Sequence, residues 1–267
     1  MRRKILHRPK YIRSGEPAYM LPTSYLESKH ELLLSVSLVT HRYLFGLVYS
    51  GLLGDYFNRM PNPSGVYIAL VVPTPLLNRD VAKPGDIDLL VVPYEGDELV
   101  LDHTMAVEIK VIRATFLKQG KSPNSLGMSQ AAGLVEMGFP YVSVAHLIVS
   151  DESPEKEWRP MKLLRVVNSD GLCQFLPDVN VDCMPMDLMR RAIGKMQTAR
   201  PNPFIGLAAV YLGSDDAQIT GHGSTWHPET MPASPITKLN TALLDRIADL
   251  LEKRPAAFMD IPRYDPM

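Results

Sequence analysis

The sequence predicts an α/β protein with a mixed central β-sheet flanked by helices and a decorated C-terminal half. Apolar runs of strand length recur along the chain and are bounded by Gly, Pro and acidic residues. Segments with a helical spacing of apolar residues stand before, between and after these runs. The chain has 267 residues, of which 46% are hydrophobic, so it can bury a sizeable core within one domain.

The first half of the chain predicts a long helix followed by three strands. We expect the helix over 24–54, because Ser24 with the Glu three residues later matches a capping box. The run GVYIALVVP at 65–73 has the β-branched content of a strand. The runs at 86–93 and 99–112 are joined by YEGDE, whose Gly and acids favour a hairpin turn. These two strands should therefore be antiparallel.

The second half of the chain predicts helices alternating with further strands. Small residues at helical spacing in 129–139 favour a helix that lies close on the sheet. The last helix, at 234–253, is expected to start with Ser234 as its N-cap. The other predicted elements are a strand at 141–149, a strand or hairpin around 161–167, a helix at 185–197 and a strand at 204–213.

Charge and cysteine content limit the classes of protein that fit. The formal net charge of -1 means that any binding of a polyanion must be local. Cys173 and Cys183 are too few for a disulfide framework or a four-cysteine zinc site, which predicts a reducing, cytoplasmic location. His222 and His227 lack the further ligands that zinc needs, so their segment predicts a turn-rich loop.

The sequence predicts no association with a membrane. The basic start, MRRKILHRPKYIR, lacks the apolar core of a secretory signal and predicts an exposed arm. The most apolar long stretch is interrupted by Glu31, His41 and Arg42, so it does not reach the length of an uncharged membrane span.

Acidic residues interrupt two apolar runs in which a carboxylate is costly to bury. Asp86 and Asp88 stand at the start of one run, and Glu108 and Lys110 lie in the other. Glu108 and Lys110 are two residues apart, so both side chains leave the same face of their strand. Because the two runs are expected to pair, Asp88 can lie close to this face.

This combination of an Asp, a Glu and a Lys is suited to phosphodiester hydrolysis. Two neighbouring carboxylates repel each other unless a cation lies between them, and Mg²⁺ prefers oxygen ligands. A bound metal ion lowers the pKa of a coordinated water, and an ammonium group nearby can orient that water or stabilise negative charge in the transition state. An inert buried ion pair at a strand end is the alternative interpretation.

Three segments carry a resemblance to a known family. GDIDLLVV at 85–92, VEIKV at 107–111 and SQAAG at 129–133 resemble the PD-(D/E)XK nuclease superfamily, which has the restriction-endonuclease-like fold. The resemblance covers residues 24–150 and includes the order of the elements. It implies metal-dependent hydrolysis of nucleic-acid phosphodiesters.

The resemblance also implies roles for individual residues. Asp88 and Glu108 would be ligands of Mg²⁺ or Mn²⁺, and Lys110 would be the catalytic lysine. Glu31 matches the acidic residue of the first helix that completes the metal site in many members. Gln130 resembles a glutamine that several branches place on the helix after the lysine strand. Asp86, on the same face as Asp88, would support the site without being the main ligand.

Basic residues near these motifs are candidates for contacts with nucleic acid. Arg113, Lys118 and Lys121 follow the strand that carries Lys110 and could contact phosphates beside the metal site. A solvated loop is the alternative interpretation. The near-neutral net charge suggests that the substrate is also gripped by the basic N-terminal arm or by another subunit.

The sequence thus predicts a single nuclease domain of four segments, namely a basic arm 1–22, a catalytic core 23–150, an insertion 151–200 and a final part 201–267. The expected activity is metal-dependent endonucleolytic cleavage of DNA, with RNA as the alternative substrate. A homodimer would supply two sites for the two strands of a duplex. A catalytically silent scaffold or nucleic-acid-binding subunit, beside a partner protein such as an ATPase, is the second hypothesis.

Overall fold

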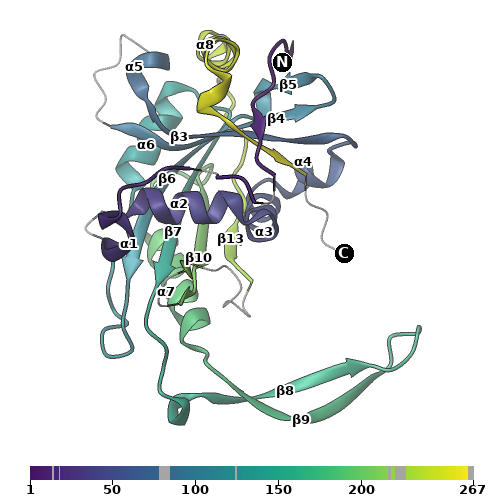
Figure 1. The fold of residues 1–267 in the computed structure, drawn as a ribbon, viewed down its shortest axis with the longest axis vertical. Helices are drawn as coiled ribbons and strands as arrows, with labels where there is room; N and C mark the ends of the chain where they lie inside the picture. Colours follow the sequence, from purple (N-terminus) through teal and green to yellow (C-terminus); the bar gives the residue numbers. More distant parts are fainter. Residues whose placement is uncertain are drawn as a thin grey trace.

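The computed structural model describes residues 1–13, 15–17, 19–77, 85–123, 125–215, 218–219 and 227–263. Its centre is a mixed β-sheet with helices on both faces (Figure 1). The predicted α/β class is therefore confirmed. Five strands form the middle of the sheet: β3 (Ser64–Pro73), β4 (Asp86–Glu95), β6 (Met105–Arg113), β7 (Tyr141–Val149) and β10 (Gly206–Tyr211).

Of the five middle strands, β4 alone runs opposite to the other four. β3 and β4 are antiparallel, β4 and β6 are antiparallel, and β6, β7 and β10 are parallel to one another. The predicted antiparallel pairing of the two acidic runs is thus confirmed. The turn after β4 contains Gly96 with a φ of 55°, a value that suits glycine, and leads into the short β5 (Glu98–Val100).

Shorter strands extend the sheet on both sides. β13 (Glu229–Met231) pairs with β10, and β14 (Met259–Pro262) pairs with β3. The chain also contains β1 (Arg2–Lys4), β2 (Lys10–Tyr11), the pair β8 (Arg159–Val166) and β9 (Cys173–Val181), and the pair β11 (Ser214–Asp215) and β12 (Gln218–Ile219). Single turns of 3₁₀-helix occur at Leu101–His103, Glu155–Glu157 and Pro255–Ala257.

The helices divide between the two faces of the sheet. α2 (Glu31–Thr40), α3 (Arg42–Leu52) and α4 (Gly54–Arg59) pack on one face through an apolar cluster that includes Phe45 and Ile109. The other face is covered by α5 (Thr74–Leu77), α6 (Met128–Met137), α7 (Met184–Ala199) and α8 (Thr241–Lys253). Because both faces are covered, the middle strands read as almost continuous apolar runs.

The predicted single helix over 24–54 is wrong. The segment forms α1 (Ser24–Ser28), α2, α3 and the first residue of α4, and the axes of α2 and α3 differ by 92°. His30 and His41 separate the helices, because each uses its Nδ1 to accept the backbone N–H of a residue in the following helix. The predicted cap is also wrong, since Ser24 lies inside α1 and the N-cap Thr23 makes no side-chain cap hydrogen bond.

Among the described residues, no single helix is long and apolar enough to cross a membrane. α2 and α3 together would pass by length and composition, and they are separated by the sharp bend described above. In the structure both helices pack on the central sheet.

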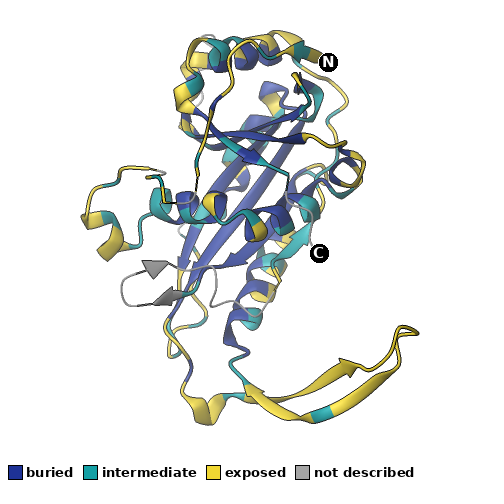
Figure 2. Cartoon of the chain, turned by 45° about the vertical axis from the view of Figure 1, so that its right-hand side comes forward, coloured by how far each residue is buried: buried dark blue, intermediate teal, exposed yellow. Residues whose placement is uncertain are grey.

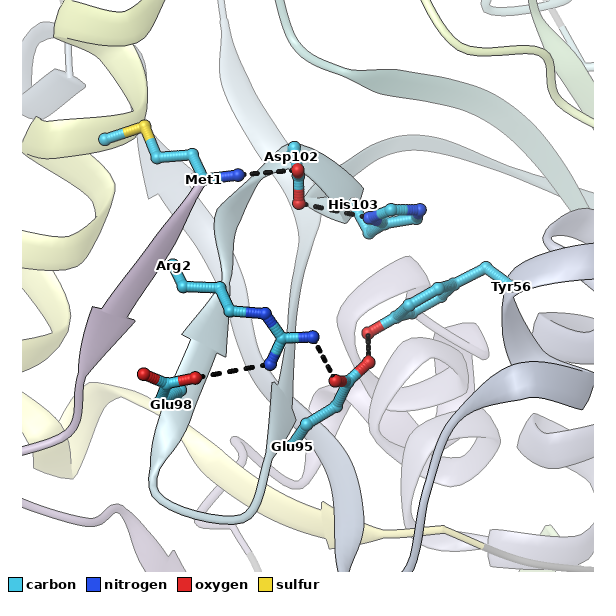
Figure 3. A network of polar contacts seen from close by, with 7 residues as sticks. All are labelled: Met1, Arg2, Tyr56, Glu95, Glu98, Asp102 and His103. Carbon is cyan, nitrogen blue, oxygen red and sulfur yellow. Dashed lines mark hydrogen bonds and ion pairs between the residues drawn. The ribbon is translucent and has the colours of Figure 1, made fainter.

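The basic N-terminal segment is largely exposed, as predicted, and two short strands in it join the sheet, which was not predicted. β1 pairs with β5, and β2 pairs with β14. Figure 3 shows how Arg2 bridges Glu95 and Glu98, while Tyr56 donates to the other oxygen of Glu95. The amino group of Met1 lies 2.5 Å from Asp102 in the same network.

Three of the four arginines of this segment are engaged by acids of the same chain. The ion pairs are Arg2 with Glu95 and Glu98, Arg3 with Asp249 and Glu252, and Arg8 with Asp97. β1 lies beside the end of β4 that carries Glu95, which is opposite to the end that carries Asp88. A contribution of these arginines to binding near Asp88 is therefore not supported.

The insertion forms a long ribbon and a helix. β8 and β9 pair antiparallel, which confirms the predicted hairpin, and the ribbon extends away from the sheet (Figure 1). Nearly all of its residues are exposed, as Figure 2 shows. α7 follows the ribbon and returns to the sheet, where it buries Leu188, Met189, Ala192 and Met196.

The start of the C-terminal helix was predicted incorrectly. α8 begins at Thr241, seven residues later than predicted, and its N-cap is Asn240 instead of Ser234. The Oδ1 of Asn240 accepts from the Leu243 N–H at 3.1 Å, and its Nδ2 donates to the Met137 carbonyl at 3.1 Å. One side chain thus starts α8 and also closes the end of α6.

This double role makes Asn240 important for stability. We expect Asn240→Ala to lower the free energy of unfolding by about 1 to 2 kcal/mol, because it removes an N-cap and leaves the Met137 carbonyl without this donor. Urea unfolding followed by circular dichroism measures this change. Ser234→Ala is the control and should change stability by less than about 0.5 kcal/mol. Equal losses in both variants would contradict the assignment.

Candidate metal centre

The register of β4 and β6 places Asp88 opposite Glu108. Leu89 pairs with Val107, so Asp88 and Glu108 are the next facing positions along the two strands. There the backbone pairing gives way to a side-chain contact, in which the Ile109 N–H donates to Oδ2 of Asp88 at 2.7 Å. This bond fixes the Asp88 carboxylate beside β6. The predicted proximity of the two acids is therefore observed.

Glu108 is the most deeply buried residue of the group. It is 1% exposed, on the face of the sheet that α6 covers. Its Oε1 lies 2.6 Å from Nζ of Lys110, an ion pair outside hydrogen-bond alignment, and this oxygen has no hydrogen-bond partner. A buried carboxylate oxygen of this kind is unusual, because burial without a hydrogen bond is costly.

Glu31 approaches from the opposite layer. It is the first residue of α2, partly buried, and it lines an open groove of about 620 Å³ together with Lys110 and Gln130. Burial, followed by the charge of Asp88, raises the pKa of the Glu31 carboxyl. The two carboxylates are therefore close enough to influence each other, as the predicted role of Glu31 requires.

Gln130 lies on α6 where two hollows meet. Besides the groove with Glu31, it lines a smaller hollow of about 140 Å³ with Asp86 and Glu108. Asp86 is exposed at the start of β4 and is not the acid that receives the Ile109 N–H. Asp88 is the acid anchored to β6, whereas Asp86 is the acid that lines the hollow with Glu108, so the preference for Asp88 as the main ligand stays a prediction.

The three predicted nucleic-acid contacts lie in different settings. Arg113 lines the groove, and its guanidinium donates to the carbonyls of Ser28 and Lys29 at the end of α1. Lys121 is exposed and lines the same groove. Lys118 is exposed and is not among the residues that line it. The structure thus brings two of these three cations to the groove.

The charges of the centre influence one another strongly. Burial, followed by the charge of Asp88, raises the pKa of Glu108 to about 7. Burial also raises the pKa of Asp88, against the lowering effect of the Ile109 N–H. Burial alone would lower the pKa of Lys110, but the close contact with the negatively charged Glu108 outweighs it and the pKa is raised. Three carboxylates around one ammonium group form a site that favours a further cation.

The residues present fit a divalent cation of the Mg²⁺ type. Within the described part of the chain, no group of three or more His, Cys, Asp or Glu side chains is arranged to hold a metal ion by itself. Mg²⁺ does not need such a set, because it is usually bound by one or two carboxylates together with water and substrate phosphates. Asp88 and Glu108 supply the two carboxylates, and Oε1 of Glu108 is the buried oxygen without a hydrogen bond. The predicted turn-rich loop around His222 lies outside the described residues.

Gly127 is part of the site, although the sequence analysis did not identify it. It is the N-cap of α6 with a φ of 78°. A Cβ at this position would lie 2.9 Å from Cγ of Glu108 and 3.5 Å from Cγ of Lys110. The absence of a side chain therefore allows α6 to start directly against the two functional residues. In the sequence, the only sign of this role is a Gly directly before an apolar helical pattern. Such a Gly is equally well explained as an ordinary helix cap.

His146 is a second residue that the sequence analysis missed. It is fully buried on β7, in register with Lys110, and its Nε2 lies 3.3 Å from the Leu126 carbonyl. Burial lowers its pKa to about 4, so the imidazole is neutral at pH 7 and can donate its Nε2 proton to that carbonyl. Leu126 directly precedes Gly127, and His146 thus helps to hold the backbone that contacts Glu108.

Gly127→Ala should destabilise the protein through two effects. Alanine is strained at positive φ, and its Cβ would meet Glu108. We expect the free energy of unfolding to fall by about 2 kcal/mol, as measured by urea unfolding. Gly120→Ala is the matched control, because a Cβ there meets no atom within 4 Å, and should change stability by less than about 0.5 kcal/mol. Similar stability of the two variants would argue against the close contact.

His146 should contribute to loss of stability in acid. Its pKa in the folded state is about 4 against 6.5 in the unfolded state, so the unfolded chain binds the extra proton between these values. Stability from the neutral imidazole is complete above pH 6.5 and is lost as the pH falls toward 4, by up to about 3 kcal/mol. Urea unfolding of wild type and His146→Gln across this range isolates the effect. Parallel pH profiles would contradict it.

Comparison with known proteins does not add to this description. No known protein family, no curated protein and no solved structure matches the chain. The mixed sheet and its flanking helices are therefore established from this structure alone. The chemistry of the site is likewise argued from its own residues.

Proposed function

We propose that the protein is a metal-dependent nuclease with the restriction-endonuclease-like fold, and that it hydrolyses phosphodiester bonds of DNA. The observation that carries the proposal is the facing pair of Asp88 and Glu108 beside Lys110, in which a buried oxygen of Glu108 has no hydrogen-bond partner. An inert ion pair would be expected to satisfy its buried oxygens. Two hollows beside this pair leave room for a substrate.

Asp88 and Glu108 would hold Mg²⁺ or Mn²⁺, with Glu31 assisting from α2. When bound, such an ion supplies charge stabilisation and a coordinated water of lowered pKa. Glu108 must lose any proton it carries before it can act as a ligand, because metal binding requires the carboxylate form. The Ile109 N–H keeps the Asp88 carboxylate oriented while this occurs.

Lys110 would act on the reacting atoms in the groove. Hydrolysis adds the oxygen of water to phosphorus and breaks one P–O ester bond, and the departing oxygen gains a proton. The ammonium of Lys110 can orient the attacking water and stabilise the extra negative charge on the phosphate. Gln130, which lines both hollows, would donate a hydrogen bond to the same phosphate or water.

Cleavage of plasmid and linear DNA by the purified protein, with Mg²⁺, Mn²⁺ or EDTA, tests the proposal. We expect cleavage that depends on the metal ion. Asp88→Ala and Glu108→Gln should abolish it through loss of metal binding, and Lys110→Ala should lower the rate by about 10² to 10³. Asp86→Asn should retain most of the activity, because Asp86 lies at the exposed rim.

Lys4→Ala and Glu98→Gln are matched controls that remove equivalent charges from the opposite end of the sheet. They should cleave at the wild-type rate. A folded wild type that cleaves neither DNA nor a matched RNA with any metal ion would refute the nuclease and favour the silent scaffold. Activity on RNA alone would correct the substrate and leave the residue roles intact. Isothermal titration with Mn²⁺ reports metal binding independently of cleavage.

A further inference from the structure

We infer that the surface of α7 next to the metal centre binds the sugar-phosphate backbone of the nucleic acid, with Arg191 and Lys195 as its phosphate contacts. This inference rests on the proposed nuclease function. It concerns a part of the chain outside residues 24–150, to which the family resemblance is confined. The partner is a phosphodiester backbone recognised by charge, independently of base sequence.

The hollow on α7 shares wall residues with the groove beside Lys110. The groove beside Glu31 and Lys110 is also lined by Ser122 and Pro123. The same two residues line a second open hollow of about 660 Å³, whose other wall is α7. A narrow pocket between them is lined by Lys121 and by the two α7 cations. A strand that lies in the first groove can therefore continue over Ser122 onto α7.

The two cations of α7 differ from the adjacent Arg190 in their partners. Arg191 and Lys195 are four residues apart, so they share one side of the helix. Neither makes an ion pair with a described residue, whereas the adjacent Arg190 lies 3.3 Å from Glu229. Their recorded contacts are with neutral groups, namely the Gln119 carbonyl for Arg191 and the Gly120 carbonyl and Ser122 hydroxyl for Lys195. Their positive charge is thus uncompensated at the wall of the hollow.

Other lining residues suit a backbone more than bases. None of the described residues that line the groove or the α7 hollow is aromatic, so a platform for base stacking is not present among them. Ser122, Ser125 and Thr198 provide hydroxyl groups, which are common phosphate donors. Gly194 lies between the two cations, and a Cβ there would meet no atom within 4 Å. Because Gly194 has no side chain, a nucleic-acid backbone can approach the helix closely at this point.

Net charge gives a reason for a local surface of this kind. The chain has a formal net charge of -1, and Arg2, Arg3 and Arg8 of the N-terminal segment are paired with acids. Binding of a polyanion then requires cations that are gathered in one place without acidic partners. Lys121, Arg191 and Lys195 meet this condition around the hollow.

The test measures binding of a fluorescent DNA duplex of arbitrary sequence by anisotropy, in Ca²⁺, over a series of NaCl concentrations. The double variant Arg191→Gln/Lys195→Gln should bind at least about tenfold more weakly at low salt. The slope of log affinity against log salt should fall by about 2, since each lost phosphate contact removes about 0.9. Arg190→Gln, the neighbour on α7 whose partner is Glu229, should match the wild type in both quantities.

A second double variant separates charge from support of the loop at 119–122. Arg191→Lys/Lys195→Arg keeps both charges and should keep the wild-type slope of log affinity against log salt. If the two residues only hold the loop, this variant should change the slope as much as the Gln variant does. The inference would be overturned if the wild-type protein binds and cleaves DNA and the Gln variant shows the same slope of log affinity against log salt. The proposed nuclease function would be unaffected by that result. Failure of the wild type to cleave would instead count against the proposed function, and the salt slopes would still report on α7.

Discussion

The hydrogen bond from the Ile109 N–H to the Asp88 carboxylate is the contact on which the centre depends. It lies where the pairing of β4 and β6 ends, so the Ile109 N–H donates to the Asp88 side chain instead of to a backbone carbonyl of β4. This anchors Asp88 opposite Glu108 and brings together two carboxylates that repel each other. Their repulsion is the reason that a cation is favoured there, and Lys110 alone leaves Oε1 of Glu108 without a hydrogen bond.

Elements from both faces of the sheet converge on this end of β6. α2 starts with Glu31 on one side, and α6 starts after Gly127 on the other. Helix N-termini carry partial positive charge, so both helices present the end that stabilises nearby carboxylates. The break between α2 and its neighbours is therefore useful, because one continuous helix over 24–54 could not turn its first residue toward the sheet end and also wrap the opposite face.

The strands and the acidic pair were predictable from sequence because they depend on local pattern. Apolar runs of strand length, bounded by Gly, Pro and acidic residues, define the strand positions. A glycine turn between two of these runs implies that Asp88 and Glu108 can face each other. The broken helix and the start of α8 were not predictable in the same way. His30, His41 and Asn240 act as caps through contacts that depend on where the chain turns, and Asn240 also bonds a carbonyl about a hundred residues away. Gly127 and His146 were missed because their importance arises from neighbours on other elements.

The segment between β6 and α6 connects the centre to α7, and it is held from both sides. On the inner side, His146 contacts the Leu126 carbonyl, next to the glycine that touches Glu108. On the outer side, Arg191 and Lys195 contact the carbonyls of Gln119 and Gly120. A displacement of this segment would therefore disturb Glu108 and the cationic wall together. The position of Glu108 and that of the two α7 cations consequently depend on one short stretch of backbone, which a buried imidazole helps to hold.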